Sequence, residues 1–370
     1  MKKKKNYLKY FPIVLCFILG YSFGVISNKI PELNNIVNNK FLEISIFILI
    51  FYLSIFIQII IHELGHLVFG LLTGYKFLSF RIGSFMILKR DKKLEFKKMS
   101  LVGTGGQCLM SPPDMKNGKV KNFLYNMGGV IFNIIFSSLF VILLLIINIP
   151  YLKLLLLFLI LVGIYTILVN GIPMRLDINN DGSNALMLYK NKEAHYSFWL
   201  QMKINEQILL GKSLKDMPKE WFKLKKEIST NPMINTINVF YCNKLIEEKN
   251  FKKAYQEMDK LLDGDYNIIE IYQYLMTLEC IYCELVDNKK DKYLVKYQDK
   301  TMQRFINSMK NFPTVLRVNY AYALLKENNS VKANDIKNKF EKMALTYPYP
   351  TDIINERELI DYVTNIKETN

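Results

Sequence analysis

Hydrophobic residues are concentrated in the first half of the chain, in four windows that contain few charged positions. The hydrocarbon core of a bilayer is about 30 Å thick, and a helix crosses it with about 17 to 25 predominantly apolar residues. The pattern therefore predicts four membrane-spanning helices, at Phe11–Ser27, Phe41–Leu72, Phe123–Ile147 and Leu152–Asn170. MKKKK before the first window is also typical of a signal peptide, but no small-residue cleavage site closes that window, so we expect a retained helix.

The polar and apolar positions follow a different pattern between the second and third windows. Residues 77–113 contain alternating apolar and polar positions around RDKK at 90–93, and then Gly-Gly and Pro-Pro pairs. Alternation with a period of two indicates β-strands that are buried on one face, and the Gly and Pro pairs indicate turns. We therefore predict a small β-hairpin at the membrane surface, followed by an irregular loop.

From about residue 183 the chain has the composition of a soluble protein, with charged residues dispersed at helical spacing. Residues 239–262 predict a helix, a short turn and a second helix, and a similar pattern returns at 320–343. Ala254 of the first pattern corresponds to Ala333 of the second. This section resembles tetratricopeptide-type repeats, in which helix pairs stack on their neighbours. A helical bundle without repeats is the alternative.

These patterns together predict the fold class. We expect a mainly α polytopic membrane protein with about four transmembrane helices, a small membrane-surface β-hairpin and a C-terminal cytoplasmic α-helical domain. Residues 1–40 would hold the first transmembrane helix and a short external loop. Residues 41–182 would form a membrane core, and residues 183–370 the cytoplasmic, repeat-like helical domain.

Composition narrows the class of protein. The 370-residue chain is 51% hydrophobic and has a formal net charge of +16, which excludes disorder and is typical of a membrane protein with basic loops. No recognised nucleic-acid-binding module accompanies the charge, so we expect no nucleic-acid partner. The five cysteines are too few and too scattered for a disulfide framework. We interpret the C-x-x-C pair Cys280 and Cys283 as two free thiols on a buried helix, since no second ligand pair lies nearby.

The positions of Lys and Arg predict the orientation. The first nine residues and the loop between the second and third windows are rich in lysine, whereas residues 28–40 have only Lys29 and Lys40. The positive-inside rule therefore places both termini and the long central loop in the cytoplasm. We expect a multi-pass protein of the cell membrane, with the lipid bilayer as its surroundings.

The end of the second window, QIIIHELGHLVFG at 58–70, carries candidate chemistry. His62 and His66 are four residues apart, so both imidazoles leave the same face of a helix, with Glu63 beside them. A catalytic zinc ion takes three protein ligands and a water, and a neighbouring carboxylate can take a proton from this water. Ionisable groups at membrane depth are costly and usually functional. We therefore expect a Zn²⁺ site; a structural zinc site is the alternative, but such sites prefer several cysteines.

A third ligand must come from another segment, and the fourth window ends in NGIPMRLDINNDGSN at 170–184. With H-E-x-x-H, this stretch resembles the site-2 protease family of intramembrane zinc metalloproteases, which carries N-x-x-P and Asp-Gly at the end of another membrane helix. The resemblance implies that an aspartate is the third ligand. Asp177 follows Pro173 by four residues and precedes Ile, whereas Asp181 follows it by eight and precedes Gly182. We take Asp181 as the ligand because glycine allows a sharp backbone turn, with Asp177 as the alternative.

The aspartates also have a possible structural role. Either aspartate could instead cap a helix that starts near Ser183. The predicted orientation supports the metal site, because the second and fourth helices both run toward the cytoplasm and bring their motifs to the same side.

NMGGVIFNIIFSS at 126–138, in the third window, is a further candidate part of the site. Gly128 and Gly129 allow another helix or an extended peptide to come close, and Asn133 places an amide inside the membrane. The resembled family has a Gly-rich patch and an inward asparagine here. This resemblance implies a catalytic role for Asn133, in holding the substrate backbone or the developing oxyanion; packing between helices is the alternative.

The resemblance implies a zinc endopeptidase with residues 41–182 as its core. His62, His66 and Asp181 would hold the metal, and Glu63 would act as general base and then acid on a transmembrane or membrane-associated peptide near the cytoplasmic leaflet. Residues 183–370 could bind a cytoplasmic protein partner. Two alternatives are a non-catalytic membrane adaptor or immunity protein of the same fold, and a zinc transport protein with Gln58 on its path.

Overall fold

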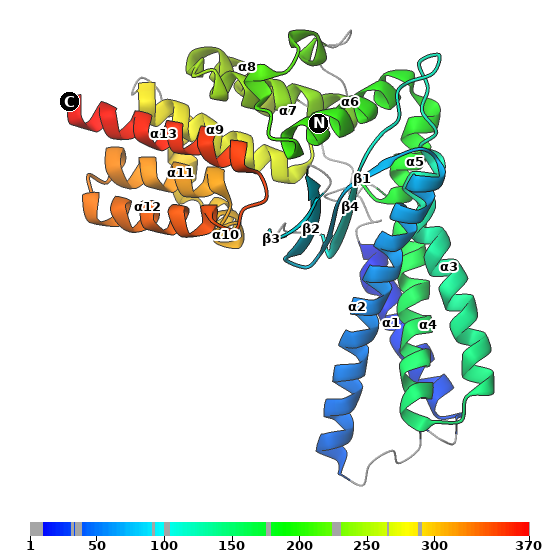
Figure 1. Cartoon of the computed structure of the whole chain (residues 1–370). Coiled ribbons are helices and arrows are strands. Elements are labelled where there is room, and N and C mark those ends of the chain that lie inside the picture. The colour runs from blue at the N-terminus through cyan, green and yellow to red at the C-terminus, as the bar shows by residue number, and fades with distance from the viewer. Residues whose placement is uncertain are drawn as a thin grey trace. The chain divides into compact units, whose positions relative to one another are not determined.

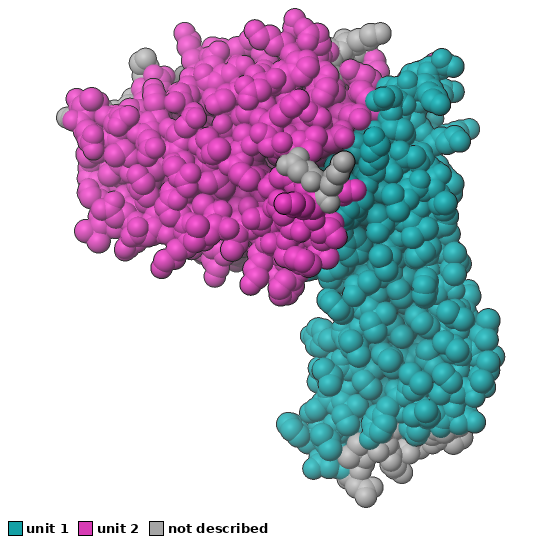
Figure 2. All heavy atoms as spheres, in the orientation of Figure 1, with its two compact units in different colours: residues 1–82, 105–191 teal, residues 83–104, 192–370 magenta. Residues whose placement is uncertain are grey.

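The computed structural model describes residues 10–30, 33, 39–90, 93–99, 104–174, 179–223, 231–264, 266–287 and 291–369. The chain forms two compact units. Unit 1 comprises Met1–Ile82 and Gly105–Asn191, and unit 2 comprises Gly83–Thr104 and Lys192–Asn370 (Figure 2). Each unit is therefore built from two separate stretches of the chain, because the chain passes from unit 1 into unit 2 at residue 83 and returns to unit 1 at residue 105.

Long apolar helices build unit 1. They are α1 (Phe11–Ser27), α2 (Lys40–Leu72), α3 (Phe123–Ile146) and α4 (Pro150–Gly171), followed by the short α5 (Asp181–Lys190). Local signals place the helix starts. The Asn39 side chain accepts hydrogen bonds from the backbone N–H groups of Phe41 and Leu42 at the start of α2, and Pro150 occupies the first position of α4.

Helices α2, α3 and α4 are long and apolar enough to cross a membrane, with mean hydropathies of 2.8, 2.7 and 2.7. They lie side by side in Figure 1. Their outer faces carry exposed large side chains such as Phe41 and Leu145, which need an apolar solvent. Three of the four predicted spans are thus confirmed as helices of this kind, with bounds that agree to within two residues at each end. The first predicted span coincides with α1, a shorter apolar helix of 17 residues, and the four-span count stays a prediction.

Small residues bring α2 and α3 together. A Cβ atom at Gly65 would lie 2.3 Å from the carbonyl oxygen of Gly128, and one at Gly128 would lie 2.5 Å from the carbonyl oxygen of Gly65. The two backbones are therefore in direct contact, as is common where membrane helices pack through small residues. This contact lies one turn or less from His62 and His66 in sequence, so it sets the distance of α3 from the candidate site.

Antiparallel strand pairs occur in both units. In unit 1, β1 (Lys76–Ile82) pairs with β4 (Gly106–Ser111), with an irregularity in the register between Phe77 and Ser79. In unit 2, β2 (Phe85–Arg90) pairs with β3 (Lys93–Lys98). The second pair confirms the predicted hairpin. The sequence had predicted an irregular stretch where β4 forms.

Unit 2 is a helical assembly, which confirms the mainly helical prediction for the second half of the chain. Its α-helices are α6 (Lys192–Leu209), α7 (Pro232–Glu247), α8 (Phe251–Asp263), α9 (Glu270–Asp287), α10 (Lys300–Ser308), α11 (Pro313–Ala321), α12 (Ser330–Ala344) and α13 (Pro350–Thr369). Within the described part of unit 2, short helical turns also occur at Leu214–Asp216, Lys219–Phe222, Leu294–Gln298 and Tyr322–Lys326.

Small side chains are buried in the core of unit 2. Ala254 on α8 and Ala333 on α12 are buried in one hydrophobic core, which also contains Cys280 and Cys283 of α9 as free thiols. The buried-helix interpretation of the C-x-x-C pair is thus confirmed. That the helix pairs are tetratricopeptide-type repeats stays a prediction.

Candidate metal centre and active site

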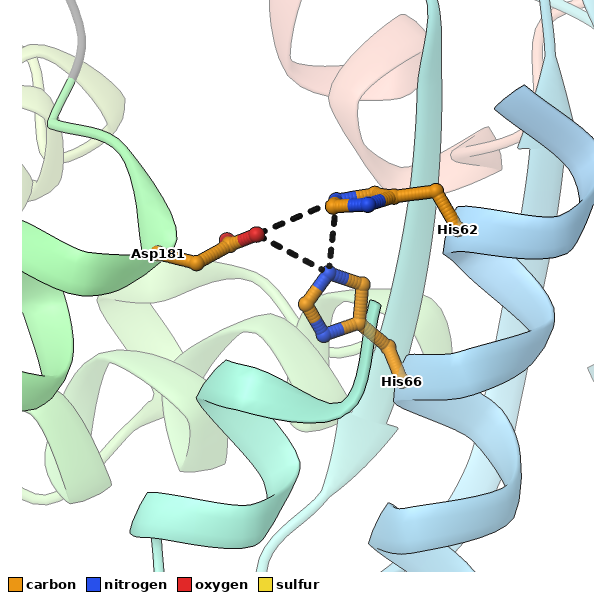
Figure 3. A group of neighbouring side chains, drawn as sticks. All are labelled: His62, His66 and Asp181. Atoms are coloured by element: carbon orange, nitrogen blue, oxygen red, sulfur yellow. Dashed lines mark hydrogen bonds and ion pairs between the residues drawn. The ribbon is translucent and has the colours of Figure 1, made fainter. Parts of the chain in front are cut away.

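His62, Glu63 and His66 lie near the C-terminal end of α2, inside unit 1. His62 and Glu63 are buried, and the His66 side chain is 12% exposed. The fourth residue, Asp181, is the first residue of α5 and lies far away in sequence. Figure 3 shows Asp181 pointing toward both imidazole rings, which project from one face of α2. The structure therefore brings together the three residues that the sequence analysis proposed as ligands.

The ligand atoms of these residues form a compact triangle. Asp181 Oδ2 lies 3.0 Å from His62 Nε2 and 3.5 Å from His66 Nε2, and the two Nε2 atoms are 3.2 Å apart. Zinc bonds to nitrogen and oxygen of about 2.0–2.2 Å in tetrahedral geometry imply ligand atoms about 3.3–3.5 Å apart. Among the described residues, this is the group of His, Cys, Asp and Glu side chains whose ligand atoms could hold one metal ion. The spacing fits zinc.

The hydrogen bonds on the far side of each ring determine which ring nitrogen faces the centre. His66 Nδ1 is 2.7 Å from the carbonyl oxygen of Tyr125, which can only accept, so Nδ1–H must donate. His62 Nδ1 is 2.7 Å from Asn133 Oδ1. In the neutral rings both Nε2 atoms then present lone pairs toward Asp181 Oδ2, which is buried and accepts no hydrogen bond. Three lone pairs that converge in this way could hold one metal ion.

Asp181 is also electrostatically suited to bind a cation. Burial by itself would raise the pKa of its carboxyl group, but His66 and His62, when they are protonated, more than offset this and hold the pKa well below its usual range. The residue is therefore a carboxylate at neutral pH. A carboxylate and two imidazoles form the mixed oxygen and nitrogen set that is typical of catalytic zinc sites.

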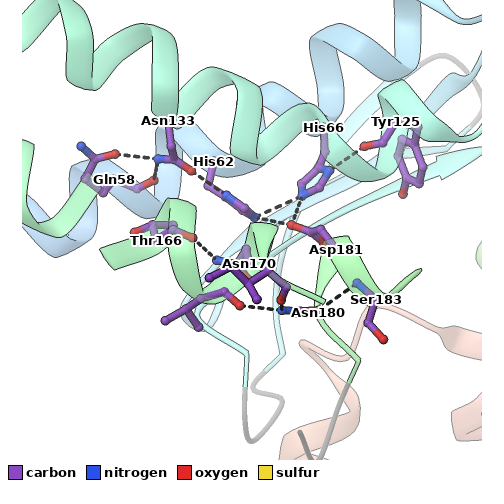
Figure 4. Close-up of polar contacts among 12 residues, drawn as sticks. Gln58, His62, His66, Tyr125, Asn133, Thr166, Asn170, Asn180, Asp181 and Ser183 are labelled. Carbon is purple, nitrogen blue, oxygen red and sulfur yellow. Dashed lines mark hydrogen bonds and ion pairs between the residues drawn. The ribbon is translucent and has the colours of Figure 1, made fainter. Parts of the chain in front are cut away.

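Asn180 holds the start of α5 against the end of α4, as Figure 4 shows. Its Oδ1 accepts hydrogen bonds from the backbone N–H groups of Ser183 and Met174, at 2.9 and 3.1 Å. Its Nδ2 donates to the carbonyl oxygens of Val169 and Ile172, both at 2.6 Å. Asn180 is thus the N-cap of α5, and Asp181 does not take the capping role that the sequence analysis offered as an alternative. The sequence analysis did not single out Asn180.

The structure differs from the sequence prediction at Gly182, next to the candidate ligand Asp181. Gly182 has no positive φ, so it does not serve the sharp turn that we expected; a Cβ atom there would lie 2.2 Å from the carbonyl oxygen of Gly171. The glycine is needed for close packing of α5 on α4. Asp177, the alternative ligand, lies outside the described residues.

Asn133 of α3 is fully buried beside His62. Its Oδ1 faces His62 Nδ1, and its Nδ2 lies 2.6 Å from Gln58 Oε1, so both ends of the amide have partners in unit 1 (Figure 4). Gly129 also lies against His62, because a Cβ atom at Gly129 would be 2.5 Å from the ring. The glycine patch and the asparagine of α3 therefore both contact the first histidine.

Glu63 packs against backbone at the start of β4. A Cβ atom at Gly106 would lie 2.6 Å from Glu63 Oε1, so only glycine leaves room for this carboxyl group. Arg81 on β1 is 1% exposed, and its Nη2 is 3.5 Å from the carbonyl oxygen of Gly106. Arg81 is also close enough to interact electrostatically with Glu63. The sequence analysis missed Arg81, because a charged residue in an alternating strand is normally expected on the solvent face.

Comparison with known proteins is consistent with this geometry. The family model of peptidase family M50 matches residues 50–341, which include the candidate ligands and Glu63. No curated protein and no solved structure matches the sequence. Since the family match spans well over half of the chain, and the membrane helices carry the site that its H-E-x-x-H motif predicts, the chain belongs to peptidase family M50, the site-2 protease family.

Proposed function

We propose that the chain is a zinc-dependent intramembrane endopeptidase. The observation that carries the proposal is the convergence of His62 Nε2, His66 Nε2 and Asp181 Oδ2 within 3.5 Å of one another, next to Glu63 and at the end of a membrane helix. These three residues would hold the zinc ion. Bound there, zinc would supply a Lewis acid for the scissile carbonyl and lower the pKa of the attacking water.

The protein's own residues supply the proton transfers. Glu63 would take a proton from the attacking water on a carboxylate oxygen and deliver it to the leaving amine nitrogen. The position of Glu63 supports this role. Its carboxyl group packs against the backbone of Gly106, at the start of β4. A substrate segment that adopts an extended conformation beside this strand would expose its peptide bond, which a helix shields.

The substrate would be a transmembrane or membrane-associated peptide cut near the cytoplasmic leaflet. The support is the lysine-rich N-terminus and central loop, which favour a cytoplasmic location for both termini and hence for the end of α2 that carries His62. We also propose that the protein resides in the cell membrane. Cleavage there would serve regulated proteolysis or peptide maturation.

We further propose that unit 2 binds an acidic segment of a cytoplasmic protein partner. Unit 2 has a cavity of about 700 Å³ whose lining includes Lys219, Lys223, Lys244, Lys253 and Lys260, against two glutamates. This excess of lysine favours an acidic ligand. A fluorescent Glu-rich peptide should bind the wild type and bind at least tenfold more weakly to the Lys253→Glu, Lys260→Glu double variant; equal binding would rule this cavity out.

The test of the protease proposal compares the wild type with Glu63→Gln, because this variant removes the proton acceptor and leaves all three candidate ligands. Both proteins are purified in detergent and assayed for zinc, and both are expressed in cells whose membrane fraction is searched by mass spectrometry for new peptide termini inside transmembrane segments. We expect about one zinc per chain in both, and such termini only with the wild type. Identical termini with both proteins would overturn the proposal, and zinc binding with no new termini would favour a peptide-binding adaptor.

A further inference from the structure

A chain of buried amides extends from His62 away from the candidate metal ligands. His62 Nδ1 lies 2.7 Å from Asn133 Oδ1. Asn133 Nδ2 donates to Gln58 Oε1 at 2.6 Å, and Gln58 Nε2 donates to the carbonyl oxygen of Leu159 at 2.6 Å. The chain thus joins α2, α3 and α4 inside unit 1, and Figure 4 shows its first two links in line with the His62 ring.

The direction of these hydrogen bonds is determined at the end that lies furthest from the site. The Leu159 carbonyl has no proton to donate, so the Gln58 group that faces it must be the NH₂ group. Gln58 Oε1 then faces Asn133 and requires the Asn133 NH₂ group, which leaves Asn133 Oδ1 for His62. Nδ1 of His62 must therefore carry the proton, and Nε2 must present its lone pair to the centre.

Both amide side chains of this arrangement are shielded from bulk solvent. Gln58 and Asn133 are both 0% exposed, between helices that cross the membrane. The packing of α4 against Gln58 also supports a specific position for this amide. A Cβ atom at Gly163 of α4 would lie 2.8 Å from Gln58 Nε2 and 2.1 Å from Ser137 Oγ, so α4 leaves room for the Gln58 amide only because residue 163 is glycine.

We propose that Gln58 and Asn133, with Gly163 providing their space, form a positioning relay that fixes the tautomer and the ring orientation of His62. The inference rests on the proposed zinc-dependent function, because its consequence is that His62 Nε2 is always available to the metal. His66 differs, since its Nδ1 lies against the backbone carbonyl of Tyr125. Side-chain substitutions can therefore disturb the His62 partner directly, but not the partner of His66.

The first test measures zinc affinity by chelator competition and, with Co²⁺ in place of zinc, the visible absorption spectrum. Loss of an outer-shell partner typically costs about 10- to 100-fold in metal affinity, so Asn133→Leu should lose affinity in this range. Asn133→Asp should recover only part of that loss, because the new carboxylate still accepts from His62 Nδ1 but no longer donates to Gln58 Oε1. Gln58→Leu should weaken zinc binding and change the Co²⁺ spectrum in the same sense as Asn133→Leu.

The second test leaves the relay residues intact. Ser137→Ala removes the hydroxyl that a new methyl group at 163 would meet first, and by itself it should leave zinc affinity unchanged. Adding Gly163→Ala to this variant places a methyl group 2.8 Å from Gln58 Nε2, with the Cβ atom of residue 137 further away at 3.3 Å, and should lower zinc affinity at least threefold. Gly24→Ala is the matched control, because no atom lies within 4 Å of a Cβ atom there.

The outcomes separate this inference from the protease proposal. If Asn133→Leu and the Gly163→Ala variant are folded and bind zinc as tightly as the wild type with unchanged Co²⁺ spectra, the relay is wrong and the protease proposal stands. If the wild type binds zinc but cleaves no peptide and the variants lose zinc, the relay stands and the protease proposal is wrong. A folded wild type that binds no added zinc would overturn both.

Discussion

Gly182 lies directly against the carbonyl oxygen of Gly171, where α5 begins beside the end of α4. A Cβ atom at residue 182 would be 2.2 Å from that oxygen, well inside van der Waals contact. The Asp-Gly pair is therefore explained by packing of two helices. The close approach places Asp181 opposite His62 and His66, so the third candidate ligand depends on the small size of its neighbour.

Gly182→Ala should consequently displace Asp181 and weaken metal binding without removing any ligand. We expect zinc affinity to fall at least tenfold, because α5 must shift to accommodate the methyl group. Chelator competition on the purified protein measures this. Leu186→Ala, an exposed position on the same helix, is the control and should bind zinc like the wild type; wild-type affinity in Gly182→Ala would show that Asp181 is not held by this contact.

Asp181→Asn should remove the carboxylate from the ligand triangle. The expected loss of zinc affinity exceeds the roughly 10- to 100-fold that an outer-shell change costs. Asp177→Asn is the matched comparison and should keep about one zinc per chain. The reverse result, with zinc lost from Asp177→Asn and kept by Asp181→Asn, would exchange the roles of the two aspartates.

Asn180→Ala removes the N-cap of α5 together with its bonds to the end of α4. Loss of an Asn cap typically costs about 0.5–2 kcal/mol, and the bonds to Val169 and Ile172 add to this. We expect a lower thermal midpoint in detergent and faster proteolysis between α4 and α5. Asn180→Asp keeps the capping acceptor and should lie between the wild type and the alanine variant. A midpoint equal to that of the wild type would argue against this account of Asn180.

Arg317 is fully buried in unit 2, where it forms an ion pair with Glu279 at 2.6 Å and a second with Glu356. Arg317→Met should destabilise unit 2 by about 3–5 kcal/mol, since it leaves buried carboxylates without a partner. Trp199 and Trp221 are the two tryptophans of the chain and both belong to unit 2, so urea unfolding followed by tryptophan fluorescence reports on this unit. Combining Arg317→Met with Glu279→Met and Glu356→Met should recover much of the loss. A single variant as stable as the wild type would contradict the prediction.

Asp352 on α13 should make the stability of unit 2 depend on pH. Burial, with Glu247 and Glu356 nearby, raises its pKa from 3.8 to about 8. The folded state therefore keeps a proton that the unfolded state releases, so this group's contribution is fully present below about pH 4 and is lost as pH rises toward 8. In Asp352→Asn the decline in urea stability between these pH values should be smaller. An unchanged pH profile would show that Asp352 titrates near its ordinary pKa.

The sequence is informative about the elements of this protein because their signals are local. Bilayer-length apolar windows predicted α2, α3 and α4, and the spacing of His62, Glu63 and His66 needs only the helical repeat to place them together. Alternation around RDKK likewise predicted the hairpin of β2 and β3. Each of these features depends on residues that are close neighbours in sequence.

Other relationships could not be predicted in this way. Asp181 competed with Asp177 in the sequence, and the contact between Asn133 and His62 joins residues 71 positions apart. The inward direction of Arg81 and the capping role of Asn180 depend on what the rest of the fold places around them. The glycine at 182 was expected to serve a sharp turn, which the backbone does not make.

The sequence by itself therefore determined the membrane helices, the hairpin and the histidine pair with its glutamate, because helical and strand periodicity and bilayer thickness act along a single segment. Only the tertiary structure decided that Asp181 and Asn133 lie against the histidines and which way their hydrogen bonds run. The Gly65–Gly128 contact and the packing of Gly182 on Gly171 set those distances. The reason is physical: distances and hydrogen-bond directions between segments follow from how their surfaces pack in three dimensions, and residue spacing along the chain does not encode them directly.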